Sequence, residues 1–114
     1  VVQDWLGLGP SLVVVTRGAE GATFALRGAD PVLAASADVK MVDTVGAGDS
    51  FMAGLLSGLL DAGLLGGEGA RVKLGQATHA DVLPAVQRAI ATSGVTVSRA
   101  GAYAPTRKEL ETVL

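Results

Sequence analysis

The sequence contains no cysteine, which excludes a disulfide scaffold and any site built on a cysteine nucleophile or a cysteine metal ligand. Charge is also scarce and balanced, because Lys and Arg number 9, Asp and Glu number 11, and the formal net charge is −2. This balance provides no electrostatic footprint for nucleic acid or for an anionic membrane. We therefore expect a cytoplasmic protein whose partners include neither nucleic acid nor a membrane.

Aromatic residues make up only 4% of the chain, whereas hydrophobic residues make up 49% and charged residues 18%. A disordered tail would be poorer in apolar residues and richer in charge. The chain has 114 residues and starts at Val1 rather than at Met, and a small domain leaves much of its apolar surface hard to cover. We expect it to be part of a longer chain, or to pack on a partner.

Glycine is abundant, with 16 residues, or about one residue in seven, which is roughly twice its ordinary usage. The glycines cluster irregularly, so a collagen-like repeat is excluded. Their clusters instead indicate several loops that need glycine, set between apolar segments. This composition favours a small α/β domain.

Three short strands are predicted in the first third of the chain. The β-branched run at 12–15 is typical of a strand that is buried on both faces, as in parallel sheets. Residues 23–26 are expected to return as a hairpin partner after a glycine-rich turn at 16–21, and 32–34 to form another strand. The segment at 39–42 is expected to be extended.

Helical spacing of apolar residues predicts two longer helices further along the chain. Residues 50–60 contain no charge, and their small residues, which include Gly54 and Gly58, would let neighbouring backbones approach closely. A second helix is expected over 80–93 and is expected to stop at Gly94. A glycine-rich loop is predicted between the two helices, and a short helix is predicted near the C-terminus.

The sequence Asp-Thr-Val-Gly-Ala-Gly-Asp at 43–49 leads directly into the first of these helices. Backbone N–H groups at a helix N-terminus have no intrahelical partner, and small residues leave them unshielded, so the segment is suited to bind an anion. Asp49 would stand beside that anion, where a carboxylate can accept a proton from a hydroxyl that attacks a phosphoryl group. A tight turn in which Asp49 merely caps the helix is the alternative.

Two familiar glycine motifs do not fit this segment. A dinucleotide-binding loop would require its third glycine at the position of Phe51, and a Walker loop would require a lysine, but none lies between Lys40 and Lys73. The segment must therefore belong to another kind of loop if it binds a phosphate.

The sequence at 43–51 resembles the C-terminal signature of the PfkB (ribokinase-like) family of carbohydrate kinases, which reads Asp-Thr-x-Gly-Ala-Gly-Asp-x-Phe. Two further segments resemble landmarks of the same family. The sequence Thr-Arg-Gly-Ala-Glu-Gly at 16–21 is similar to its nucleotide-phosphate turn, and Ser-Arg-Ala-Gly-Ala at 98–102 is similar to its closing segment. Within the family, the chain looks most like bacterial fructokinases.

The resemblance implies a ribokinase-like α/β fold, with 1–114 as the C-terminal part of a sheet flanked by helices. It also implies ATP-dependent phosphoryl transfer to a sugar hydroxyl, with Mg²⁺. Asp49 would be the catalytic base, and the anion hole would be formed by Gly46, Ala47 and Gly48.

The same resemblance implies that the ATP phosphates lie at the turn that contains Thr16, Gly18 and Gly21, although an ordinary hairpin loop is the alternative there. The adenine is expected between 64–75 and 89–93. Some relatives bind a monovalent cation such as K⁺ at the position of Asp43, for which a turn-forming aspartate is an equally good interpretation.

A complete member of this family also carries an N-terminal half with the sugar-binding residues, a lid, and an Asn-x-x-Glu motif, whereas this sequence contains no asparagine. We therefore expect the piece to be inactive alone and to need the missing N-terminal half or a homo-oligomer partner. The expected substrate is fructose or a similar small sugar. The alternatives are a non-catalytic module that binds a nucleotide or a partner, and a purely structural domain.

Overall fold

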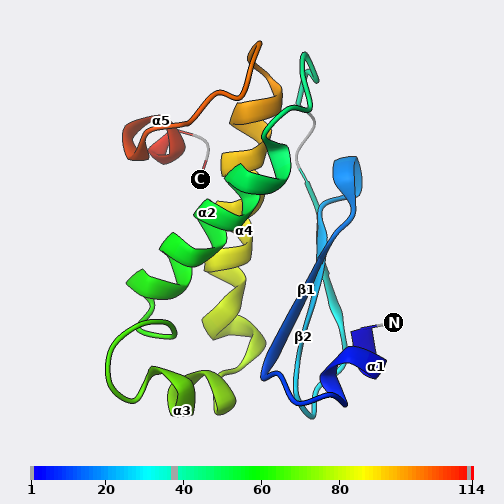
Figure 1. The fold of residues 1–114 in the computed structure, drawn as a ribbon, viewed down its shortest axis with the longest axis vertical. Helices are drawn as coiled ribbons and strands as arrows, with labels where there is room; N and C mark the ends of the chain where they lie inside the picture. The colour runs from blue at the N-terminus through cyan, green and yellow to red at the C-terminus, as the bar shows by residue number, and fades with distance from the viewer. Residues whose placement is uncertain (1, 37–38, 113) are drawn as a thin grey trace.

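The structure is a computed structural model that describes residues 2–36, 39–112 and 114. A small sheet lies beside two long helices that run in opposite directions (Figure 1). In chain order the elements are α1 (Val2–Leu6), β1 (Leu12–Thr16), the 3₁₀ turn η1 (Gly18–Glu20), β2 (Ala22–Leu26), β3 (Val32–Ala34), α2 (Ala47–Asp61), α3 (Ala70–Gly75), α4 (His79–Val97) and α5 (Arg107–Glu111).

The sheet has three strands in the order β1-β2-β3, and both pairings are antiparallel. The predicted hairpin is confirmed, with Val14 opposite Phe24. The expectation of a parallel-type strand at 12–15 is wrong in the described part of the chain. There β1 pairs with β2 alone and is only partly buried, whereas the central strand β2 is buried at all five positions.

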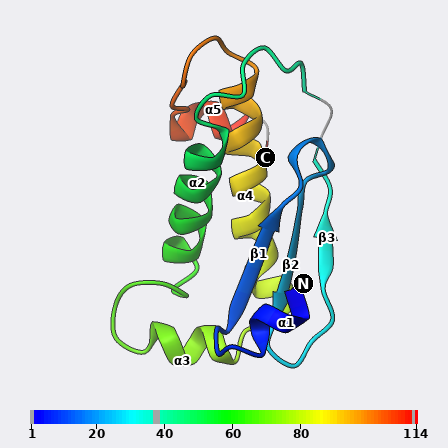
Figure 2. The ribbon, with the colours of Figure 1, turned by 45° about the vertical axis from the view of Figure 1, so that its right-hand side comes forward.

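The core is divided by the sheet into two layers. On one face, α1 packs its Val2 and Leu6 against Val13 and Ala25 of the strands. On the other face α4 lies between the sheet and α2 (Figure 2). The larger cluster on this side joins Phe24 of β2 to apolar residues of both long helices, so most of the burial stabilises the arrangement of α2 and α4.

Close approach of α2 and α4 depends on two glycines, as the sequence predicts. A Cβ atom added at Gly58 would lie 2.6 Å from Ala85 Cα, and one added at Gly54 would lie 2.8 Å from Ala89 Cα. Both distances are shorter than real contacts allow, so the two backbones could not keep this separation with any larger residue.

We expect Gly58→Val to lower the free energy of unfolding by about 1–3 kcal/mol, the usual range for overpacking a core. The clash is with backbone atoms of α4, which cannot rotate out of the way. The measurement is thermal or urea unfolding of the complete protein. Ala80→Val, at an exposed position in the first turn of α4, is the matched control and should change stability by less than about 0.5 kcal/mol. Equal effects of the two substitutions would contradict this packing.

The second long helix does not stop at Gly94 but continues to Val97, so that prediction is wrong. Its buried face extends through Thr96 and Val97, and the Val97 carbonyl accepts hydrogen bonds from the N–H groups of Val42 (2.7 Å) and Asp43 (3.1 Å). Burial and these tertiary bonds outweigh the low helix propensity of one glycine. None of the helices in the described ranges is long and apolar enough to cross a membrane.

Candidate functional site

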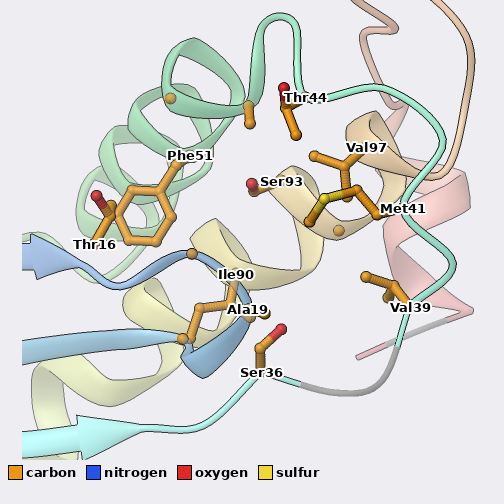
Figure 3. Close-up of a pocket in the computed structure, with 15 residues that line it drawn as sticks. Thr16, Ala19, Ser36, Val39, Met41, Thr44, Phe51, Ile90, Ser93 and Val97 are labelled. Atoms are coloured by element: carbon orange, nitrogen blue, oxygen red, sulfur yellow. The ribbon is translucent and has the colours of Figure 1, made fainter.

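A cavity of about 340 Å³ lies between the β1–β2 turn, the N-terminus of α2 and the last turns of α4 (Figure 3). It brings together Thr16, Gly18 and Gly21 of the turn with Ala47 and Gly48 of the helix. These two glycine-rich segments are separated by more than 20 positions in the sequence, yet they line one space.

The turn at 16–21 is closed by its own backbone. Arg17 N–H donates to the Gly21 carbonyl (2.8 Å), and Gly21 N–H donates to the Gly18 carbonyl (3.2 Å). Gly21 has φ +103°, and a Cβ added there would overlap the Ala34 carbonyl oxygen, so the fold itself requires glycine at this position. The Arg17 side chain bends back and donates through Nε to Thr23 Oγ1 at 2.7 Å.

The N-terminus of α2 presents backbone donors without covering side chains. Gly46, with φ +81°, is the N-cap, and the Ser50 N–H donates to its carbonyl oxygen at 2.9 Å. The Ala47 N–H donates a hydrogen bond to the Thr44 carbonyl oxygen (3.2 Å). The N–H groups of Gly48 and Asp49 precede the first i to i−4 bond of the helix, so both can donate to an acceptor that lies outside the helix.

Two of the three residues expected to form the anion hole, Ala47 and Gly48, line the cavity. Gly46 lies behind them, where an added Cβ would be 3.0 Å from Ala102 Cβ. Asp49 is exposed in the first turn of α2, next to Gly48 in sequence. Since Gly46 occupies the N-cap position, Asp49 is not the capping residue.

Asp43 joins the glycine loop to the closing segment. Its Oδ1 accepts a hydrogen bond from Val45 N–H (2.9 Å), and its Oδ2 accepts one from Gly101 N–H (3.0 Å). These bonds, the Val45 bond first, hold the pKa of the Asp43 carboxyl below its ordinary value. The geometry is that of a turn-forming aspartate.

No group of three or more His, Cys, Asp or Glu residues that could hold a metal ion occurs among the described residues. A cation beside Asp43 would therefore depend on backbone carbonyl oxygens for its other ligands. The role of Asp43 in binding a monovalent cation stays a prediction.

The end of the cavity away from the glycine-rich turn is lined by apolar side chains. The sequence predicted only part of this lining. Of the two segments expected around the adenine, 89–93 contributes Ile90 and Ser93 to the lining, whereas the loop at 64–75 does not. That loop lies at the opposite end of α2 (Figure 1). Val39 and Met41 line the cavity in its place (Figure 3), and their only signal in the sequence is an extended apolar stretch.

Sequence reasoning also missed Thr96, which is completely buried in the last turn of α4. Its hydroxyl oxygen lies 2.7 Å from Ser50 Oγ and 2.7 Å from the Tyr103 carbonyl oxygen. The helical spacing of Thr92 and Thr96 places both on the buried face of α4, but no pattern in the sequence indicates this bridge.

Solved structures with the same fold include kinases named ribokinase and fructokinase and an aminoimidazole riboside kinase. A fructokinase from Vibrio cholerae O395, solved with fructose, ADP and a potassium ion, matches this chain with a TM-score of 0.76 and 29% identity, over 97% of this chain and 33% of that one. The chain thus has the ribokinase-like fold that the sequence predicts.

Sequence comparison agrees with the structural match. Residues 2–109 match the pfkB family carbohydrate kinases, and the chain belongs to this family. It is 49% identical over 59 residues to a fructokinase from Rhizobium leguminosarum bv. trifolii, covering 52% of this chain and 18% of that protein. It is 39% identical over 61 residues to a 2-dehydro-3-deoxygluconokinase from Bacillus subtilis (strain 168), covering 54% of this chain and 19% of that protein.

Proposed function

We propose that the complete protein transfers a phosphoryl group from ATP to a hydroxyl of a small sugar, and that the cavity described above holds the nucleotide. The observation that carries this proposal is the shared lining of the cavity by the 16–21 turn and the N-terminus of α2. Membership of a carbohydrate kinase family supports the reaction class. Since ATP is the donor, we place the reaction in the cytoplasm.

The cavity has two chemically different ends that suit the two ends of ATP. Side chains of Val39, Met41, Ile90 and Val97 offer apolar surface to the base. At the other end, the glycine-rich turn and Gly48 offer backbone to the phosphates. A nucleotide bound in this orientation would bring its terminal phosphate to the first turn of α2.

In the proposed reaction the sugar hydroxyl oxygen forms a bond to the γ-phosphorus while the bond from that phosphorus to the ADP oxygen breaks. Asp49 accepts the proton of the hydroxyl. Negative charge spreads over the equatorial oxygens of the transferring group, so the N–H groups of Gly48 and Asp49, which have no partner within the helix, stabilise the transition state. The N–H of Ala47 already donates to the Thr44 carbonyl. Mg²⁺ would be bound by the ATP phosphates and would neutralise part of their charge.

We also propose that 1–114 is the C-terminal part of a kinase domain and that the remaining part supplies the sugar-binding residues and the lid. The chain spans 33% of the Vibrio fructokinase and less than a fifth of the curated relatives by aligned length. On α2, Met52, Leu56 and Leu60 are 53%, 41% and 54% exposed at a spacing of four residues, a stripe that needs a cover. The covering partner in this proposal is the rest of the domain, and the piece alone would be inactive.

The sugar is best identified by a phosphorylation screen of the complete protein against fructose, ribose, 2-dehydro-3-deoxygluconate and adenosine. We expect fructose to give the highest kcat/KM, because relatives at 46–49% identity are fructokinases. A higher kcat/KM for another acceptor would contradict the substrate assignment while leaving the reaction class intact. Nucleotide binding without transfer to any acceptor would favour the second candidate, a non-catalytic nucleotide-binding module, which the chain's short span relative to these enzymes keeps open.

A further inference from the structure

A buried polar bridge connects the first turn of α2 to the two segments behind it. Thr96 is 0% exposed, and its hydroxyl oxygen lies 2.7 Å from Ser50 Oγ in α2, 2.7 Å from the Tyr103 carbonyl oxygen and 3.1 Å from the Thr92 carbonyl oxygen. One side chain therefore contacts α2, α4 and the segment that precedes α5.

The chemistry of the three contacts makes them mutually dependent. A hydroxyl has one proton to donate and two lone pairs that accept, whereas a carbonyl oxygen can only accept. The set is satisfied when Thr96 donates to a carbonyl and the Ser50 hydroxyl donates to Thr96. Loss of the Thr96 hydroxyl would leave these polar groups without that partner at a buried position, which is costly.

The segment at 101–103 is itself held firmly against the glycine loop. Gly101 N–H donates to Asp43 at 3.0 Å, and Ala102 abuts Gly46. The Tyr103 hydroxyl donates to Glu109 of α5 at 2.6 Å. Thr96 thus ties Ser50 to a backbone that is anchored on both sides.

We propose that Thr96, acting through Ser50, is a positioning residue for phosphoryl transfer. Ser50 directly follows Asp49, and its N–H donates to Gly46 at 2.9 Å. The bridge fixes the rotation of this turn, and with it the directions of the Gly48 and Asp49 N–H groups and of the Asp49 carboxylate. The inference rests on the proposed kinase function, in which misplacement of reacting groups by about 1 Å can cost about 100-fold in rate.

The test compares Thr96→Val, which keeps the shape and removes the hydroxyl, with Thr96→Ser, which keeps the hydroxyl. In the complete protein we expect Thr96→Val to lower kcat about 10- to 100-fold with KM for ATP within about threefold, because the apolar wall of the cavity is unchanged. Thr96→Ser should restore most of kcat. A kcat for Thr96→Val within twofold of wild type would overturn the proposal, as would equal loss in Thr96→Ser.

Two further variants separate positioning from stability. Thr92→Val removes a buried hydroxyl one turn earlier on the same helix, where it donates to the Arg88 carbonyl at 2.7 Å within α4, and should leave kcat unchanged. Ser50→Ala removes the partner at a half-buried position and should reproduce the loss seen in Thr96→Val even if that variant folds poorly. Full activity of Ser50→Ala, or an equal loss of kcat in Thr92→Val, would overturn the proposal.

Asp49→Asn distinguishes failure of this inference from failure of the proposed function. If Asp49→Asn is inactive and the Ser50 and Thr96 variants are fully active, the kinase assignment stands and the bridge is only structural. If Asp49→Asn keeps wild-type turnover, the catalytic assignment on which the bridge depends is wrong.

Discussion

Replacing Asp49 by Asn is expected to lower kcat of the complete protein by about 100- to 10,000-fold, the range in which a positioned general base contributes to a reaction. Asparagine has the same size and cannot take up the proton of the attacking hydroxyl. The dissociation constant for ATP should stay the same or decrease, because the substitution removes a negative charge beside the bound phosphates. Steady-state kinetics and calorimetric titration with ATP measure the two quantities.

The control for this experiment is Asp61→Asn at the other end of the same helix. Asp61 accepts hydrogen bonds from Arg88 (2.7 Å) and Arg107 (3.3 Å), and these two side chains, Arg88 first, lower the pKa of its carboxyl. Its loss should affect stability and leave kcat unchanged. An Asp49→Asn enzyme with wild-type kcat would show that Asp49 is not the base.

Replacing Gly48 by Val is expected to abolish most activity without harming the fold. A Cβ added at Gly48 meets nothing within 4 Å, and the residue lines the cavity from the first turn of α2. The added methyl groups would occupy the space next to the backbone donors that the phosphate must approach. We expect kcat/KM for ATP to fall about 100- to 1,000-fold, as when a donor to the transition-state charge is lost, with a melting temperature at or slightly above that of wild type.

Gly58→Val, on the same helix, should lower stability and keep activity, which is the opposite of the result expected for Gly48→Val. That substitution clashes with α4 and should lower stability, while the folded fraction keeps its activity because Gly58 does not line the cavity. Loss of stability in Gly48→Val, or unchanged kcat/KM in that variant, would contradict the site described here.

Much of the site was predictable because its signals are local. The sequence at 43–51 predicts a glycine turn followed by a helix with small residues. The hairpin turn at 16–21 is closed by backbone hydrogen bonds between its own residues. Both segments depend on local backbone conformation, which the positions of the glycines and the spacing of the apolar residues determine. Their meeting in one cavity could be expected only from the resemblance to a family.

The remaining features depend on contacts between distant segments. The run at 12–15 has the composition of a doubly covered strand, but composition does not say which strand becomes central, and β2 took that place. The helix continues through Gly94 because the residues that follow it, Thr96 and Val97, are buried and the Val97 carbonyl accepts tertiary hydrogen bonds. The bridge from Thr96 to Ser50 spans 46 positions, so no local pattern could reveal it.

We propose that the two glycine-rich segments form one nucleotide site, and the decisive measurement is a structure of the complete protein with a non-hydrolysable ATP analogue. We predict that the phosphates will contact the N–H groups of Gly48 and Asp49 and the turn at 16–21, with the base against Val39, Met41 and Ile90. An analogue that is ordered elsewhere at saturating concentration, with this cavity empty, would contradict the claim.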